Sequence, residues 1–208
     1  MRVVIADDHK LVRDGIKWML AGEPDIEIVG EASDGAALLS VLEEVETDVV
    51  LLDIRMPQVS GIEVLAELSG RKGSPPVVVL SMYHQPALIQ EAIALGAAGF
   101  LLKSAGRDEL IDAITAVAGG GSYLQVSLAR SLVARLADAV PVSPSLLTAG
   151  EREVLRLVAD GLGNREIAAR IGRTEVGVRT LLRSTFKQLG VKSRSEAVVA
   201  AFRLGIFD

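Results

Sequence analysis

Five short apolar runs, each followed by a helix-like stretch, fill the first 118 residues and limit the folds that this chain can adopt. Several runs are continuously apolar rather than alternating, which is typical of strands covered on both faces. The alternation predicts an α/β domain with a doubly wound, five-stranded parallel sheet of flavodoxin-like order 2-1-3-4-5. The expected strands are 2–6, 26–31, 48–53, 76–81 and 98–103, and the expected helices are 10–21, 35–45, 61–69, 84–95 and 106–118.

A region rich in glycine, proline and serine follows this alternation. GGGS (119–122) breaks the pattern, and SLARSLVARLAD (127–138) has the spacing of a short helix. AVPVSPS (139–145) has the composition of a linker. We therefore expect a first domain at 1–121, a linker with a short helix at 122–147, and a second domain at 148–208.

The second domain has only helical patterns. Thr148 with Glu151, and Ser193 with Glu196, fit the capping box that begins a helix. The sequence predicts a small all-α domain of four helices, at about 149–160, 164–171, 175–189 and 194–204.

Charge is distributed unevenly along the 208 residues. Residues 1–125 carry 19 acidic and 9 basic side chains, whereas residues 148–208 carry 7 acidic and 11 basic ones. The second domain is therefore the part that suits a polyanion. No apolar stretch approaches the roughly 20 residues that a membrane helix needs, and the early charges argue against a secretory leader. A cytoplasmic protein with no membrane partner is expected.

Polar residues stand where the expected strands end. Asp7 and Asp8 follow the first strand, Asp53 ends the third, Ser81 ends the fourth and Lys103 ends the fifth. The carboxyl ends of parallel strands meet at one edge of a doubly wound sheet, where such folds bind ligands. These five side chains should therefore converge.

Three carboxylates at one edge repel one another, by roughly 4 kcal/mol for a pair about 4 Å apart at an effective dielectric near 20. Protons or a hard cation must offset this repulsion. The chain has no cysteine and only two histidines, and we expect no histidine among the ligands, so an oxygen-only site favours Mg²⁺. One carboxylate can then attack a phosphoryl group, with Lys103 and Ser81 on its oxygens.

The motifs DD (7–8), DIRMPQVSG (53–61), LS (80–81) and Lys103 resemble the receiver domain of two-component response regulators. DHKLVRDGI and DIEIVGEASDG are similar to the NarL/FixJ branch of that family. The resemblance covers residues 1–118. It implies that Asp53 accepts a phosphoryl group from a sensor histidine kinase, and that Asp7, Asp8, Asp53 and the backbone carbonyl of Arg55 hold Mg²⁺.

The resemblance also implies that Ser81 and Phe100 relay the phosphorylated state. Phe100 has no phenolic hydroxyl, so a relay through a tyrosine hydrogen bond is absent here. Packing in the core is an equally strong interpretation of Phe100.

The second domain contains a helix–turn–helix pattern, NREIAARIGRTEVGVRTLLRSTFKQL (164–189). Its second helix has an apolar stripe at 178, 182, 186 and 189. Arg179, Arg183 and Lys187 recur on another face, as a helix in the DNA major groove needs. A solvated cationic face is the simpler interpretation of these three residues taken alone.

LTAGEREVLRLVADGLGNREIA and LGVKSRSEAV resemble the LuxR-type DNA-binding domain over 148–204. The resemblance makes Arg179, Thr180 and Arg183 candidates for base edges, and Lys187, Lys192 and Arg194 candidates for phosphates. The last helix is similar to the family's dimerisation helix, and packing within the domain is an equally good interpretation. The candidate face of that helix comprises Ala197, Val198, Ala201 and Leu204.

Four positions depart from the LuxR-type pattern. Val176, Gly177 and Leu181 stand where a lysine, a threonine and a histidine are usual, and Gly163 replaces a serine N-cap. Gly177 costs roughly 1 kcal/mol of helix stability relative to alanine, and the lost polar groups would remove phosphate contacts. The operator sequence therefore cannot be taken from relatives, and weaker DNA binding is expected.

The sequence predicts a response regulator that controls transcription by binding DNA, as a homodimer when phosphorylated, with RNA polymerase as a further partner. The family implies that the unphosphorylated receiver covers the recognition helix. It is not expected to be an enzyme beyond its own phosphoryl transfer and dephosphorylation, because Arg55 stands where aspartate-dependent phosphohydrolases carry a second aspartate. Two alternatives stay open, namely action mainly through a protein partner and control without phosphorylation.

Overall fold

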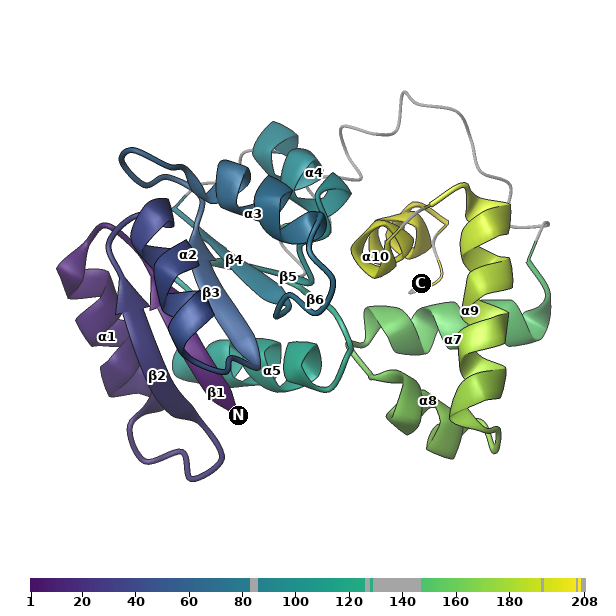
Figure 1. The fold of residues 1–208 in the computed structure, drawn as a ribbon. Coiled ribbons are helices and arrows are strands. Elements are labelled where there is room, and N and C mark those ends of the chain that lie inside the picture. Colours follow the sequence, from purple (N-terminus) through teal and green to yellow (C-terminus); the bar gives the residue numbers. More distant parts are fainter. Residues whose placement is uncertain (83–85, 126–127, 129–146, 192, 205, 207–208) are drawn as a thin grey trace.

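The computed structural model describes residues 1–82, 86–125, 128, 147–191, 193–204 and 206 (Figure 1). The side chains of Pro86 and Arg203 are outside this description. The helix expected at 127–138 and the proline-containing linker at 139–145 fall outside the described residues, apart from Leu128.

The first domain is built on a parallel sheet with the strand order β2-β1-β3-β4-β5-β6. The predicted order 2-1-3-4-5 is confirmed, and each predicted strand lies within a residue or two of its expected position. The strands are β1 (Arg2–Ala6), β2 (Glu27–Ala32), β3 (Val49–Asp53), β4 (Val77–Ser81), β5 (Gly99–Leu102) and β6 (Tyr123–Leu124).

Helices cover both faces of this sheet (Figure 1). One apolar cluster joins α1 and α5 to one face, and a second cluster joins α2, α3 and α4 to the other. All residues of β3 and β4 are buried, which explains why their sequences are continuously apolar. The helices are α1 (Lys10–Leu20), α2 (Gly35–Glu44), α3 (Gly61–Ser69), α4 (Pro86–Ala94) and α5 (Arg107–Ala118).

The sixth strand, β6, was not predicted, because its two residues lie in the region expected to be linker. It pairs with β5 in parallel. Gln125 extends the pairing, since its N–H donates to the Phe100 carbonyl at 3.3 Å and its side-chain oxygen accepts from the Leu102 N–H at 3.1 Å. The sheet therefore continues beyond residue 121.

The second domain is the predicted four-helix unit, comprising α7 (Ala149–Ala159), α8 (Asn164–Arg170), α9 (Glu175–Leu189) and α10 (Arg194–Arg203). Thr148 and Glu151 form the expected capping box at α7. Ser193 caps α10 by accepting from the Glu196 N–H at 3.2 Å. Buried residues of all four helices form two apolar clusters in this domain.

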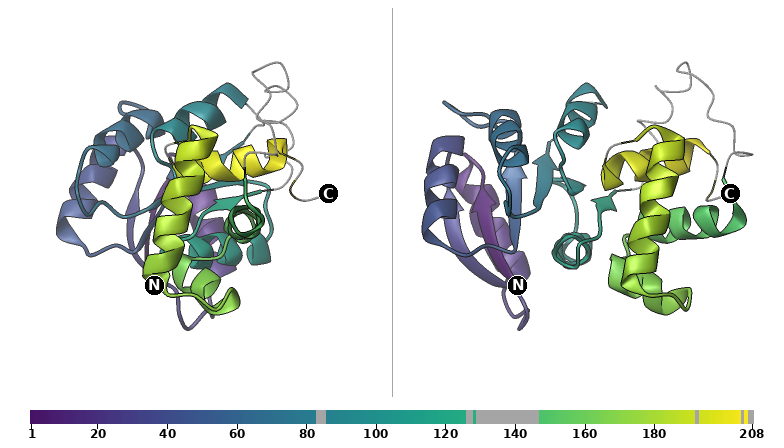
Figure 2. Two further views of the ribbon diagram at one scale, coloured as in Figure 1. Left: turned by 90° about the vertical axis from the view of Figure 1, so that its right-hand side faces the viewer. Right: turned by 45° about the vertical axis from the view of Figure 1, so that its right-hand side comes forward.

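The two domains meet near β6 and α10 (Figure 2). Val199 of α10 joins the cluster that packs under α3 and α4, and Leu124 of β6 contacts clusters of both domains. The Ser195 hydroxyl donates to the Ala97 carbonyl at 2.6 Å. Helix α10 is therefore one of the parts of the second domain that contact the first domain.

Candidate functional site

The acidic rim forms as the sequence predicts, because β1, β3 and β5 all end at the same edge of the sheet. Asp7 follows β1, Asp53 ends β3, and Lys103 follows β5. The Lys103 ammonium bridges the two carboxylates, with Nζ 2.6 Å from Asp7 Oδ2 and 2.7 Å from Asp53 Oδ2. All three side chains are almost fully buried, at 5% exposure or less. One cation therefore holds two buried anions together.

Burial and charge act in opposite directions at this site. Burial raises the pKa of Asp53 above its ordinary value, although the hydrogen bond from Lys103 works against that rise. Burial alone would lower the pKa of Lys103, but hydrogen bonds to Asp53 and Asp7 outweigh it and raise that pKa. Lys103 is therefore a charged group at neutral pH, fixed beside a partly desolvated carboxylate.

A cavity of about 250 Å³ opens beside Asp53. Ser81, at the end of β4, lies in its wall and is 9% exposed. The Arg55 N–H donates to Asp53 Oδ1 at 3.1 Å and so orients the carboxylate. The cavity thus exposes Asp53 to a small group, and its wall comprises His9, Asp53, Ile54, Arg55, Ser81, Met82, Leu88 and Lys103.

His9 lies beside the three carboxylates, which the sequence analysis did not expect. Ligand atoms of Asp7, Asp8, His9 and Asp53 all lie within 4.8 Å of one another. His9 Nδ1 is 2.6 Å from Asp8 Oδ1 and 3.4 Å from Asp7 Oδ1. The sequence feature that could have indicated this is the position of His9 directly after the paired aspartates. The three carboxylates fit a divalent cation, and His9 Nδ1 is a fourth possible ligand atom in the same cluster.

Phe100 is 1% exposed and belongs to the core cluster on the α3 and α4 side of the sheet. This position matches the packing interpretation of that residue.

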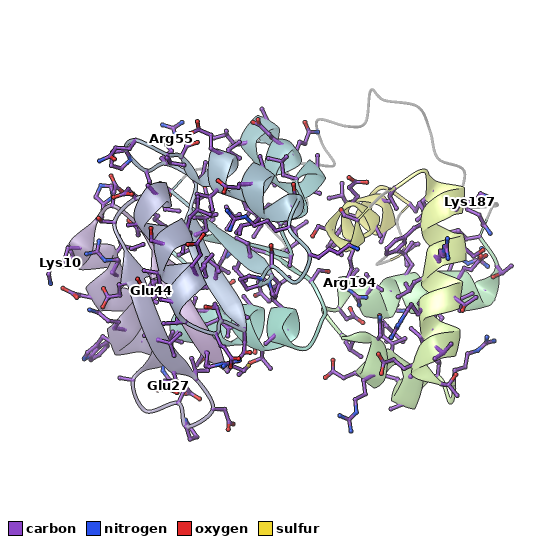
Figure 3. The ribbon with its side chains drawn as sticks, in the orientation of Figure 1. Lys10, Glu27, Glu44, Arg55, Lys187 and Arg194 are labelled. Carbon is purple, nitrogen blue, oxygen red and sulfur yellow. The ribbon has the colours of Figure 1, made fainter. Side chains whose placement is uncertain are left out.

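Helix α9 has the two faces that its spacing predicts. Val178 and Leu182 are buried in the domain core, whereas Arg179, Thr180, Arg183 and Lys187 are exposed. Figure 3 shows Lys187 on the side of the molecule away from the receiver. The structure therefore differs from the expectation that the receiver covers the recognition helix, since the cationic face is open and α10 faces the receiver instead.

Glu151 fixes α9 against α7, which the sequence suggested only in part. Beyond its capping bonds to Thr148, its carboxylate accepts from Ser184 Oγ at 3.3 Å and from Gln188 Nε2 at 2.8 Å. Glu151 is 4% exposed. The hydrogen bonds from Thr148 lower the pKa of Glu151 below its usual value. A single buried anion thus joins the first helix of this domain to its recognition helix.

Arg194 lies apart from the other DNA candidates. Its guanidinium is turned toward the joint between the domains, where it donates to Asn164 Oδ1 at 3.0 Å and to the Leu162 carbonyl (Figure 3). In this arrangement it does not extend the cationic face of α9. Lys192 is outside the described residues.

The four candidate dimerisation residues of α10 are at most 9% exposed. They pack in the two clusters of their own domain, because α7, α8 and α9 already cover that face. This corresponds to the alternative of packing within the domain. The set is Ala197, Val198, Ala201 and Leu204.

Comparison with known proteins places both domains. Residues 3–115 match the family model described as response regulator receiver domain, and residues 145–201 match bacterial regulatory proteins, luxR family. The chain is a response regulator of the NarL/FixJ family. It therefore combines a receiver with a LuxR-type DNA-binding domain and acts in transcription regulation.

The chain is 37% identical to the probable transcriptional regulatory protein NarL of Mycobacterium tuberculosis, over 100% of its own length and 96% of that protein. The crystal structure of the response regulator ChrA of a heme-sensing two-component system is 36% identical, with a TM-score of 0.55. The match covers 99% of this chain and 98% of ChrA. RcsB, in a structure of two RcsB dimers bound to two parallel DNAs, is 28% identical, with a TM-score of 0.60. The match covers 100% of this chain and 99% of the RcsB chain.

The relatives are transcriptional regulators by name, which agrees with the prediction that this regulator is not an enzyme for a separate substrate. None of the helices in the described part of the chain combines the length and apolar character that a membrane crossing requires.

Proposed function

We propose that Asp53 accepts a phosphoryl group from the phosphohistidine of a sensor kinase and that this controls DNA binding. The observation that carries the proposal is the Lys103 bridge between Asp7 and Asp53 beside a cavity. In the transfer, an Asp53 oxygen forms the new bond to phosphorus while the bond from phosphorus to the kinase imidazole breaks. The Lys103 ammonium and the Ser81 hydroxyl then contact the phosphoryl oxygens.

Asp7, Asp8 and Asp53, with the Arg55 carbonyl, would hold Mg²⁺, which when bound supplies positive charge next to the phosphoryl oxygens. The carboxylate oxygens of Asp7, Asp8 and Asp53 fit this role because they lie within 4.8 Å of one another. Phosphorylation also breaks the present balance of charge. Lys103 must then share its contacts among Asp7 and the phosphoryl oxygens, which biases a two-state receiver.

The kinase would approach along α1, which begins beside the acidic rim. Leu11 and Trp18 are 84% and 82% exposed, and their spacing of seven places them on one face of that helix. Exposed large apolar side chains near a reactive centre mark a protein contact. Trp18 is the only tryptophan, so its fluorescence should change when a kinase dimerisation domain is added and stay constant with bovine serum albumin.

In the arrangement observed here, α10 packs against β6 and α4 of the receiver. We propose that phosphorylation loosens this contact, so that the helical domain can pair with a second copy on promoter DNA and meet RNA polymerase there. The exposed Arg179, Thr180, Arg183 and Lys187 would then read the operator.

The test is Asp53→Asn, compared with wild type with and without acetyl phosphate in Mg²⁺ buffer. Wild type should gain promoter affinity and dimerise on phosphorylation, whereas the variant should show neither change. Asp14→Asn, at an exposed carboxylate on α1, serves as control. A variant at position 53 that still responds to the phosphodonor would rule out Asp53 as the switch.

A second candidate function is control mainly through a protein partner, with weak DNA binding. It is favoured by Val176, which is 70% exposed at the start of the recognition helix. A salt titration on random-sequence duplex separates the two functions. A DNA binder should lose affinity steeply as salt rises, because neutralised phosphates release counterions.

A further inference from the structure

A second cavity lies between the two domains, at the end of the sheet opposite the acidic rim. Its volume is about 640 Å³, within the range of roughly 300–1,000 Å³ that small-molecule sites occupy. The receiver wall consists of segments that precede the strands, including Thr47, Asp48 and Ala97. The other wall is the start of α10, from Ser193 to Ser195. Neither phosphoryl transfer nor the cationic face of α9 uses this space.

Two buried polar atoms at this joint lack partners among the described residues. Ser122, in the cavity wall, is 2% exposed, and its Oγ has no hydrogen-bond partner there. Arg194 Nε is also buried without one. Most buried polar groups in folded proteins are hydrogen-bonded, so two donors beside one cavity point to a missing acceptor.

Arg194 carries the positive charge at the joint, and its nearest acidic influence is Glu166, which is not within ion-pair distance among the described residues. Arg194 donates to Asn164 Oδ1 and to the Leu162 carbonyl, which are both uncharged acceptors. Burial lowers the pKa of its guanidinium to about 10, so it is still charged at neutral pH. The carboxylate in the wall, Asp48, is already paired with Arg2 at 3.1 Å. An incoming anion would therefore meet a cation that has no acidic partner among the described ion pairs.

The start of α10 adds backbone donors. This helix is ten residues long, and Ser193 caps only its third N–H, that of Glu196. The first N–H groups of a helix point out of it and carry partial positive charge, which favours an anion. Those of Arg194 and Ser195 belong to residues in the cavity wall.

We propose that this cavity binds a small anion with a carboxylate or phosphate group, held by Arg194 Nε, Ser122 Oγ and the N-terminus of α10. Ser122 belongs to the receiver side and Arg194 to the DNA-binding domain. A bound anion would therefore stabilise the contact between the two domains and couple an anionic metabolite to the state of the regulator.

The binding test is residue-resolved NMR of the full chain, titrated separately with inorganic phosphate and with citrate at constant ionic strength. The backbone amides of Ser122 and Ser195 should shift saturably, and the anion with the lower Kd identifies the group recognised. Ser122→Ala and Arg194→Lys should each raise Kd by about tenfold or more, since each removes a hydrogen bond to a charged ligand. Ser40→Ala and Arg173→Lys, at exposed positions, should leave Kd unchanged.

Shifts that rise linearly without saturating, or a Kd that is the same in Ser122→Ala and Arg194→Lys as in wild type, would mean that water alone fills the cavity and would overturn the proposal. Arg194→Met is a second variant in case lysine partly replaces the guanidinium. The measurement uses neither phosphodonor nor DNA, so its result is independent of phosphoryl transfer at Asp53.

A distance measurement tests the coupling between the domains. Because the chain has no cysteine, spin labels can be attached at Ser40→Cys on α2 and Arg173→Cys before α9 without removing native thiols. The anion should narrow the distribution of distances between the two labels, and the Ser122→Ala background should abolish the narrowing. An unchanged distribution in the cysteine pair with native Ser122 would refute the coupling.

Discussion

Gly163, at the start of α8, packs directly against the backbone of Gly119 at the end of α5. A Cβ atom placed on Gly163 would lie 2.4 Å from the Gly119 carbonyl oxygen, which is too close for any side chain. A Cβ on Gly121 would similarly lie 2.3 Å from the Gly161 carbonyl oxygen. The two domains therefore touch backbone to backbone, and the glycine at 163, where a serine is usual in LuxR-type domains, permits that contact.

Gly163→Ser should open the joint between the domains. Serine is a good N-cap, so α8 itself should not be weakened. If closure restrains the DNA-binding domain, the variant should bind DNA more tightly without a phosphodonor, by about five- to 150-fold. Fluorescence anisotropy with labelled promoter measures this change. Gly150→Ser, where a Cβ meets no atom within 4 Å, is the control, and equal affinity of the two variants would contradict the prediction.

Lys103→Met should destabilise the receiver, because it leaves the Asp7 and Asp53 carboxylates buried without their cation. Removing one partner of a buried ion pair typically costs about 3–5 kcal/mol. Urea denaturation in EDTA measures the loss, with Lys72→Met at an exposed position as control. Magnesium should raise the Tm of Lys103→Met more than that of wild type, since it replaces the missing charge. A variant as stable as wild type in EDTA would count against the bridge.

Glu151→Gln should weaken the DNA-binding domain in a pH-dependent way. Hydrogen bonds from Thr148 hold the pKa of Glu151 below its unfolded value, so the ionised form stabilises the fold. This stabilisation is complete above the unfolded pKa of about 4.3 and is lost as pH falls through the lower folded pKa. At pH 7 the variant should lose about 1–3 kcal/mol of unfolding free energy.

The difference between Glu151→Gln and wild type should therefore shrink as the solution is acidified. Denaturation curves at several pH values measure it, and Glu153→Gln, exposed on the same helix, should show no such trend. A difference that stays constant down to low pH would show that the carboxylate charge is not what Glu151 contributes.

Arg183→Ala and Lys187→Ala should affect DNA binding differently. Loss of a base contact at Arg183 should cost about 1–3 kcal/mol and relax specificity at one base pair. Loss of a phosphate contact at Lys187 should weaken binding to all sequences and reduce the salt slope by about 1. Both predictions can be tested by measuring the affinity of each variant for operator duplex and for random-sequence duplex over a range of salt concentrations. Arg71→Ala in the receiver is the control. Identical behaviour of the two variants would contradict the assigned roles.

The elements of both domains could be predicted because each carries a local signal. The apolar runs of β3 and β4 indicate strands covered on both faces, and Thr148 with Glu151 marks the start of α7. The rim followed from topology, since residues after parallel strands must meet at one edge. The contact between Lys103 and Asp53 could therefore be predicted, although the two residues are 50 positions apart in the sequence.

Features that depend on contacts between distant segments were not predictable in this way. Two residues of β6 carry too little pattern to identify a strand, and only their pairing with β5 defines it. Arg194 has the sequence context of a phosphate contact, but burial at the domain joint decides where its guanidinium lies. His9 was not expected among the ligands, and only the fold shows that the turn after β1 brings its imidazole to the same cluster as Asp53.

The short strand β6 has a consequence for the solubility of the receiver. Without it, β5 would end the sheet and present a row of unpaired N–H and carbonyl groups, which can recruit a strand from another molecule. The pairing of β6 and the Gln125 side chain occupy donors and acceptors along β5. The edge strand of the sheet is then β6, which is only two residues long. We therefore expect this margin to resist aggregation by edge-to-edge association.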